Sequence, residues 1–155
     1  MDTDRIEKTI VLRASRSVVW HALTTTEQFG TWFGARLNGT FVPGSRVSGP
    51  ITTPGYDHLK MEIVIDRVEP ERAMAYRWHP YAIDPNVDYS GEPTTLCEFT
   101  LEEVAEGTRL TVVESGFDRI PAERRDLAFR MNDGGWAAQL TNLERYLAGR
   151  ASTPA

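Results

Sequence analysis

Glu114 is the residue whose type and position in this sequence best suit acid–base chemistry. It shares the apolar face of a predicted strand with Leu110 and Val112, and the strand ends at Ser115-Gly116. A carboxylate on such a face loses hydrating water, and desolvated groups in clefts are candidates for general acid or base catalysis. Two structural alternatives stay open: a bulge that turns Glu114 outward, or an ion pair with an arginine such as Arg130.

Large aromatic side chains offer a second kind of chemistry, the recognition of apolar molecules. The chain contains 4 tryptophans, 5 tyrosines and 6 phenylalanines. Buried tryptophan and tyrosine each need a polar partner, so this number is large for a simple core and favours a cavity lined by some of them. Core packing remains the alternative for any single residue. The set is Trp32, Phe33, Tyr76, Trp78, Phe99, Phe117 and Trp136.

The sequence lacks the patterns of other catalytic and cofactor sites. Cys97 lies on the apolar face of a predicted strand, where a cysteine acts as a small hydrophobic residue. As the single cysteine it can form neither an internal disulfide nor a four-cysteine metal centre. No two of His21, His58 and His79 have metal-ligand spacing, and no nucleophile elbow, phosphate-binding loop or dinucleotide motif is present. We therefore expect no metal and no cofactor.

The elements that must position these residues follow one another in a clear order. Residues 5–12 alternate as a strand, and two short helices follow, opened by Ser15 and by the capping-box pair Thr25 and Gln28. Turn dipeptides then separate short strands, and a long proline-containing loop at 80–93 interrupts them. Strands joined by short turns form an antiparallel sheet.

A long amphipathic helix is predicted to close the chain. Pro121 suits a first helical turn, and one apolar face follows at helical spacing. Gly134-Gly135 interrupts this pattern, and the sequence does not decide whether the helix is continuous there. We expect the leucine end to pack on the sheet and the end at 131–136 to meet the aromatic helices and a cavity mouth. The apolar face consists of Trp136, Leu140, Leu143 and Leu147.

Composition narrows the class of protein. The 155 residues carry a formal net charge of −5 with no basic stripe, which argues against nucleic-acid binding. No stretch has the apolar core of a signal peptide or the roughly 20 apolar residues of a membrane span. These features predict a cytoplasmic protein with no membrane role. We expect one domain over residues 1–155, with an ordered core at about 5–148.

Several motifs in this order resemble a known family. They are V-V-W-H-A-L and T-W-F-G near the start, then G-T-R-L-T-V-V-E-S-G-F, and a late G-G-W. The chain resembles the Bet v 1-like START/SRPBCC superfamily, and within it single-domain proteins similar to the C-terminal domain of the Hsp90 ATPase activator Aha1. The resemblance implies an α+β helix-grip fold: a curved antiparallel sheet of about six or seven strands wrapped on a long C-terminal helix, with two short helices after the first strand.

The resemblance also implies a hydrophobic cavity between that helix and the sheet. The residues that we expect to line it are Trp32, Phe33, Tyr76, Trp78, Phe99, Glu114, Met131 and Trp136. The first functional hypothesis is therefore the binding of an apolar small molecule. Because this fold hosts many activities, two alternatives accompany it. One is an Aha1-like protein-interaction domain that contacts a chaperone or forms a homodimer, and the other is a cyclase or hydrolase that uses Glu114.

Overall fold

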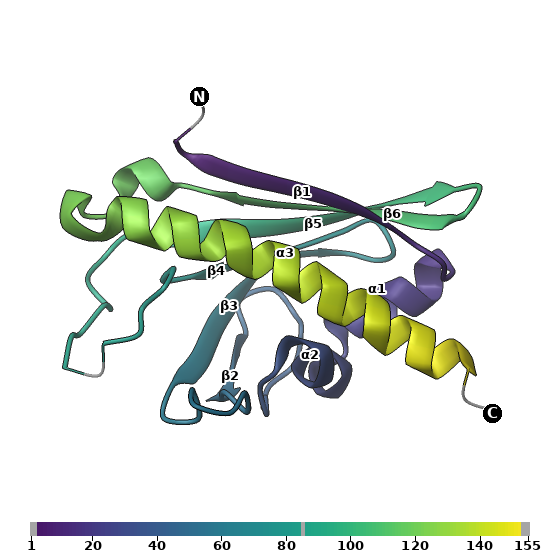
Figure 1. The fold of residues 1–155 in the computed structure, drawn as a ribbon, viewed down its shortest axis with the longest axis horizontal. Helices are drawn as coiled ribbons and strands as arrows, with labels where there is room; N and C mark the ends of the chain where they lie inside the picture. Colours follow the sequence, from purple (N-terminus) through teal and green to yellow (C-terminus); the bar gives the residue numbers. More distant parts are fainter. Residues whose placement is uncertain (1–2, 85, 153–155) are drawn as a thin grey trace.

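Six strands, three α-helices and one short 3-10 helix make up the fold in the computed structural model, which describes residues 3–84 and 86–152. The long helix α3 runs across one side of the sheet, and α1 and α2 lie beside its C-terminal half (Figure 1). The α+β helix-grip prediction is confirmed. In chain order the elements are β1 (Arg5–Leu12), α1 (Arg16–Thr24), α2 (Thr26–Phe33), β2 (Arg46–Pro50), β3 (Lys60–Glu69), β4 (Ala73–Trp78), β5 (Thr95–Val104), β6 (Gly107–Ser115), η1 (Phe117–Arg119) and α3 (Ala122–Ser152).

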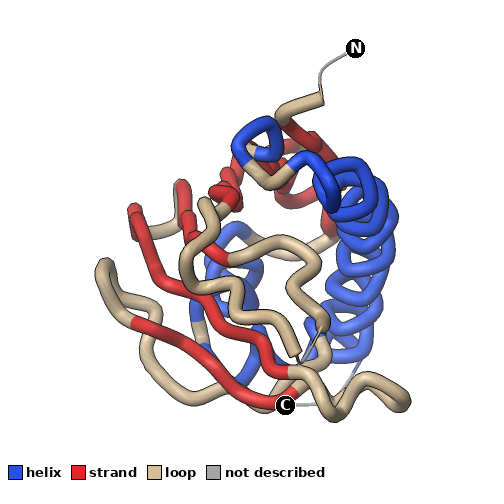
Figure 2. Tube along the Cα trace, turned by 90° about the vertical axis from the view of Figure 1, so that its left-hand side faces the viewer, coloured by secondary structure: helices blue, strands red, loops and turns tan. Residues whose placement is uncertain are grey.

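The sheet is antiparallel throughout, with strand order β1-β6-β5-β4-β3-β2. It curves around α3, as the side view in Figure 2 shows. One row of cross-strand neighbours crosses five strands at its centre, and every member of the row is buried. The row consists of Ile6, Glu114, Cys97, Tyr76 and Ile65. This register brings a carboxylate, a thiol and a phenol together beneath α3.

The two short helices form for local reasons that the sequence predicts only in part. The Ser15 side chain accepts a hydrogen bond from the Val18 N–H at 3.2 Å, which confirms the predicted N-cap of α1. Thr25 is the N-cap of α2, but its side chain makes no capping hydrogen bond, so the predicted capping box is wrong. Gln28 does not reach back to Thr25, since its side-chain oxygen accepts a hydrogen bond from the Tyr146 hydroxyl on α3.

Helix α3 is continuous through Gly134 and Gly135 over its 31 residues. Both glycines are exposed, and a Cβ atom at either position would meet nothing within 4 Å. Close packing is therefore not what these glycines provide. The predicted apolar face, which runs from Trp136 to Leu147, is buried in the hydrophobic core. Among the described residues, no helix is long and apolar enough to cross a membrane.

Candidate functional site

Glu114 lies at the centre of the molecule with its side chain fully buried. Two indole groups donate to it: Trp136 Nε1 to Oε1 at 2.8 Å and Trp78 Nε1 to Oε2 at 2.7 Å. The Thr95 hydroxyl donates to Oε2 at 2.6 Å, and Asn132 Nδ2 lies 3.0 and 3.1 Å from the two oxygens. Four side chains therefore converge on one carboxylate.

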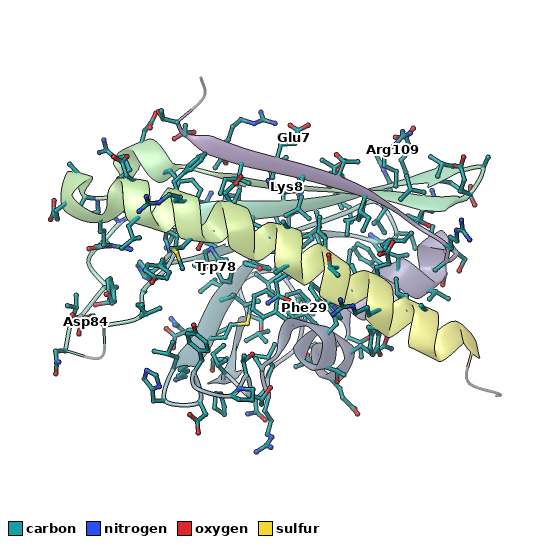
Figure 3. All side chains as sticks on the ribbon, viewed as in Figure 1. Glu7, Lys8, Phe29, Trp78, Asp84 and Arg109 are labelled. Atoms are coloured by element: carbon teal, nitrogen blue, oxygen red, sulfur yellow. The ribbon has the colours of Figure 1, made fainter. Side chains whose placement is uncertain are left out.

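These donors come from three elements that the carboxylate joins. Trp78 ends β4, Thr95 begins β5, and both lie near Glu114 because of the strand register. Asn132 and Trp136 are one helical turn apart on α3, so both face the sheet together. Figure 3 shows the Trp78 side chain beside α3. The Glu114 carboxylate thus fixes α3 to the centre of the sheet.

Both structural alternatives for Glu114 are wrong. The pairing of β6 with β1 and with β5 is regular through Glu114, so no bulge turns the side chain outward. Arg130 is exposed, and all the recorded hydrogen-bond partners of Glu114 in the described part of the chain are neutral. Indole and amide nitrogens can only donate, which suits an ionised carboxylate that can only accept.

Beyond Glu114, the cross-strand row continues on β5 and β4 with two buried titratable groups, Cys97 and Tyr76. Burial raises the pKa of the Cys97 thiol well above its ordinary value, and the nearby Glu114 charge raises it further. Burial likewise raises the pKa of the Tyr76 hydroxyl, with smaller contributions from Cys97 and Glu114. Both groups stay protonated at neutral pH, and Cys97 is the buried small residue that its strand position predicts.

Packed aromatic rings fill much of the space between α3 and the sheet. Trp78 and Trp136 lie 5.8 Å apart between ring centroids, and Phe99 lies 5.6 Å from Trp136. Trp32 belongs to the same cluster through Phe33, and its indole N–H donates to the Ala22 carbonyl at 2.8 Å. Because these rings fill the middle of the predicted cavity, open space lies beside them.

Two neighbouring pockets provide that open space. The larger has a volume of about 420 Å³ and lies between the start of β3 and the loop that joins β4 to β5. The smaller, of about 150 Å³, lies against α3. Phe33, Trp78 and Asn132 line both pockets and form the boundary between them. The other lining residues are Ile51, Leu59, Lys60, Met61, Glu62, His79, Tyr81, Ala82, Ile83, Asp88, Tyr89 and Ser90 in the larger pocket, and Gly135, Trp136 and Gln139 in the smaller.

The structure places the predicted site residues in three groups. Phe33, Trp78 and Trp136 line the pockets. Met131, by contrast, is 46% exposed and lines neither pocket. The remaining four, which lie buried behind the pocket walls, are Trp32, Tyr76, Phe99 and Glu114.

Asn132 is the main residue that sequence reasoning missed. It lies four residues before Trp136, so helical spacing alone assigns both to one face of α3. That spacing was the available signal, although nothing in the sequence ties Asn132 to Glu114. Gln139 was missed as well. Both ends of its amide form hydrogen bonds: Nε2 donates to the Phe33 carbonyl, and Oε1 accepts from Asn142.

The loop between β4 and β5 forms the outer wall of the larger pocket, and Arg124 of α3 holds its two ends. The guanidinium donates to Glu92 Oε1 at 2.6 and 2.8 Å and to the Pro80 carbonyl at 2.6 Å. It also lies 4.9 Å from the centre of the Tyr89 ring. The loop tip around Asp84 extends away from the body of the molecule (Figure 3). Pro85, within the loop predicted at 80–93, lies outside the described residues.

Three solved structures illustrate the similarity of fold. DynU16, from the dynemicin biosynthetic locus, is 25% identical with a TM-score of 0.72 over 94% of this chain, which spans only 47% of the DynU16 chain. Protein NE0264 from Nitrosomonas europaea is 20% identical with a TM-score of 0.74, covering 99% of this chain and 100% of its own. The Aha1 dimer from Colwellia psychrerythraea is 21% identical with a TM-score of 0.66, covering 90% and 92%.

Sequence comparison gives the family. Comparison with curated proteins yields no match. The model of the family described as "Activator of Hsp90 ATPase homolog 1-like protein" matches residues 13–148. This range includes both short helices, all the strands after β1, and α3 up to residue 148. The chain therefore belongs to the family of proteins like the activator of Hsp90 ATPase homolog 1, within the SRPBCC superfamily.

Proposed function

We propose that this protein binds an apolar, aromatic small molecule in the two joined pockets beside α3. The observation that carries the proposal is the shared boundary of Phe33, Trp78 and Asn132, which opens one aromatic surface to both pockets. Binding pockets for small molecules usually measure about 300–1,000 Å³ and combine apolar walls with a few polar groups. The larger pocket, at about 420 Å³, lies within that range.

The charges around the larger pocket favour a neutral ligand. Its lining contains one lysine, Lys60, against two carboxylates, Glu62 and Asp88. Hydrogen bonds from Ser90 lower the pKa of Asp88, so this carboxylate is ionised at neutral pH. An anionic ligand would meet a net negative lining, whereas a neutral aromatic molecule meets mainly the rings of Phe33 and Trp78.

A thermal-shift screen with neutral aromatic compounds tests the proposal, together with native mass spectrometry of protein purified without denaturation. A ligand at 100 times its Kd adds about 2.7 kcal/mol to the free energy of unfolding. For a chain of this size that raises the melting temperature by roughly 5–10 °C. If no compound raises the melting temperature and nothing copurifies, the proposal fails.

Two adjacent glycines supply a matched pair of variants for locating the ligand. Gly135 lines the smaller pocket, whereas Gly134 lines neither, and a Cβ at either position meets nothing within 4 Å. Gly135→Leu should fill the smaller pocket and weaken binding at least roughly tenfold, equivalent to about 1.4 kcal/mol. Gly134→Leu makes the same change in helix propensity and should leave binding unchanged. Equal effects of the two substitutions would place the ligand elsewhere.

A second candidate is an Aha1-like role in protein interaction. Family membership favours it, and so does an exposed apolar pair on the outer side of α3, Leu127 and Met131, at 42% and 46% exposure. The test is Hsp90 ATP turnover with and without the purified chain, alongside sedimentation velocity for a homodimer. A Met131→Lys variant should weaken either interaction. Unchanged turnover together with a monomeric chain would remove this candidate.

A further inference from the structure

Trp78 and Asn132 both donate to the buried carboxylate and line both pockets. Of these two side chains, Asn132 alone ends in an amide, which has a donor end and an acceptor end. Its Nδ2 lies 3.0 and 3.1 Å from the two oxygens of Glu114. The opposite orientation would place the amide oxygen against a carboxylate that can only accept, so the amide nitrogen must face inward. Glu114 therefore fixes which end of the Asn132 amide faces the interior.

The remaining end of that amide is an acceptor. The amide oxygen and nitrogen diverge from the same carbon, so Asn132 Oδ1 points away from Glu114. In the described part of the chain no hydrogen bond to Oδ1 is recorded, and Asn132 is only half-buried. Two polar groups near Asn132 are already engaged: the Trp78 indole donates to Glu114, and the Gln139 amide donates to the Phe33 carbonyl and accepts from Asn142.

We infer that Asn132 Oδ1 is the specificity determinant of the pockets and selects aromatic molecules that carry a hydrogen-bond donor, such as a phenolic hydroxyl. The inference rests on the proposed binding function and narrows its ligand class. Aromatic walls formed by Phe33 and Trp78 bind the ring, and Oδ1 accepts the proton of the hydroxyl. Glu114 is a positioning residue in this arrangement, since it orients Asn132 without contacting the ligand.

Two probes that differ only in the donor test the inference: 2-naphthol and 2-methoxynaphthalene. Isothermal titration calorimetry would measure the ratio of their Kd values in the unmodified chain and in Asn132→Leu. A neutral hydrogen bond changes affinity by roughly two- to tenfold, so the preference for 2-naphthol should fall by that factor in Asn132→Leu. Asn38→Leu is the control, because it makes the same change at an exposed residue that lines neither pocket, and the ratio should not change.

A measurement on the unmodified chain keeps the test valid if Asn132→Leu fails to fold. The ¹³Cγ resonance of Asn132 should shift when 2-naphthol is added and stay in place with 2-methoxynaphthalene. Two results would overturn the inference and leave the binding function intact. One is the same ratio of Kd values in the unmodified chain, in Asn132→Leu and in the control variant. The other is an equal shift of the Asn132 ¹³Cγ resonance with the two probes. Binding of neither probe up to its solubility limit would overturn the inference and count against the binding function.

Discussion

Glu114→Gln replaces the buried carboxylate with an amide of nearly the same shape, and we expect it to destabilise the protein. Each carboxylate oxygen accepts an indole N–H, Oε1 from Trp136 and Oε2 from Trp78. Glutamine has only one side-chain oxygen. Whichever way its amide turns, the NH₂ group faces an indole N–H, so one buried donor loses its acceptor. The substitution cannot be accommodated by rotating the side chain.

The size of the expected loss in the free energy of unfolding follows from two opposing effects. A hydrogen bond to a charged group contributes about 1.5–3 kcal/mol, and a buried donor without an acceptor costs about 1–3 kcal/mol. Removing the charge offsets part of this loss, because burying an ion itself costs several kcal/mol. Since five hydrogen-bond contacts already compensate that burial, we expect a net loss of about 2–4 kcal/mol in the free energy of unfolding, or roughly 5–15 °C in melting temperature.

Urea denaturation followed by circular dichroism measures this loss. Glu102→Gln on β5 is the matched control, because its exposed carboxylate forms a surface ion pair with Arg109 and its loss should change stability by no more than about 0.5 kcal/mol. A ¹H–¹⁵N spectrum adds a local readout: the indole signals of Trp78 and Trp136 should shift, while that of Trp32, which donates to Ala22, stays in place. A Glu114→Gln protein as stable as Glu102→Gln would refute the reasoning.

Further predictions concern the loop, the buried thiol, alkaline stability and the helix. Arg124→Ala should speed limited proteolysis between residues 80 and 92, because the contacts with Pro80 and Glu92 are lost, whereas Arg130→Ala, an exposed change on the same helix, should not. Cys97 should react with a thiol reagent only in denaturant, since burial raises its pKa and excludes the reagent; fast reaction of the native protein would contradict the buried position. Because the pKa values of Cys97 and Tyr76 are raised, the folded state keeps protons that the unfolded state loses at high pH. The free energy of unfolding should therefore fall as the pH rises above the ordinary pKa values of these groups, about 8.5 for cysteine and about 10 for tyrosine. The fall should reach up to about 1.4 kcal/mol per pH unit for each group. Cys97→Ala should flatten the first part of that fall in denaturation curves, and an unchanged slope would show that another group titrates. Gly134→Ala and Gly135→Ala should each stabilise the protein by roughly 0.5–1 kcal/mol, measured by urea denaturation, because both lie inside a continuous helix with open space around them; a loss of stability would argue against that continuity.

Local periodicity was sufficient to predict the framework of the fold. The first strand was predicted at 5–12, where β1 lies, and the alternation along β6 correctly placed Glu114 on the buried face. The family motifs correctly predicted a helix-grip order of elements. Each of these features depends on neighbours in sequence or on a pattern that recurs along one strand or one helix.

The centre of the candidate site was not predictable in the same way. The four donors to Glu114 come from β4, β5 and α3, and their convergence depends on register and on the packing of α3. Gln28 illustrates the same limit. Its spacing from Thr25 predicts a capping box, but its side chain instead accepts a hydrogen bond from Tyr146 on α3, a residue distant in sequence. The position of the pockets depends on how completely the aromatic rings fill the space under α3, and that volume is a property of the assembled structure.

The strand order has a consequence for how the chain folds. β1 is the first strand in sequence, yet its partner is β6: Thr9 lies beside Thr111, 102 residues further along the chain. The sheet cannot acquire this strand during synthesis until β6 has left the ribosome, and Glu114 finds Asn132 and Trp136 later still. Pairings so distant in sequence slow folding, because the loop must close before the contact stabilises it. We therefore expect the docking of β1 and α3 to be late events in folding, with the β3–β4 and β5–β6 hairpins forming first.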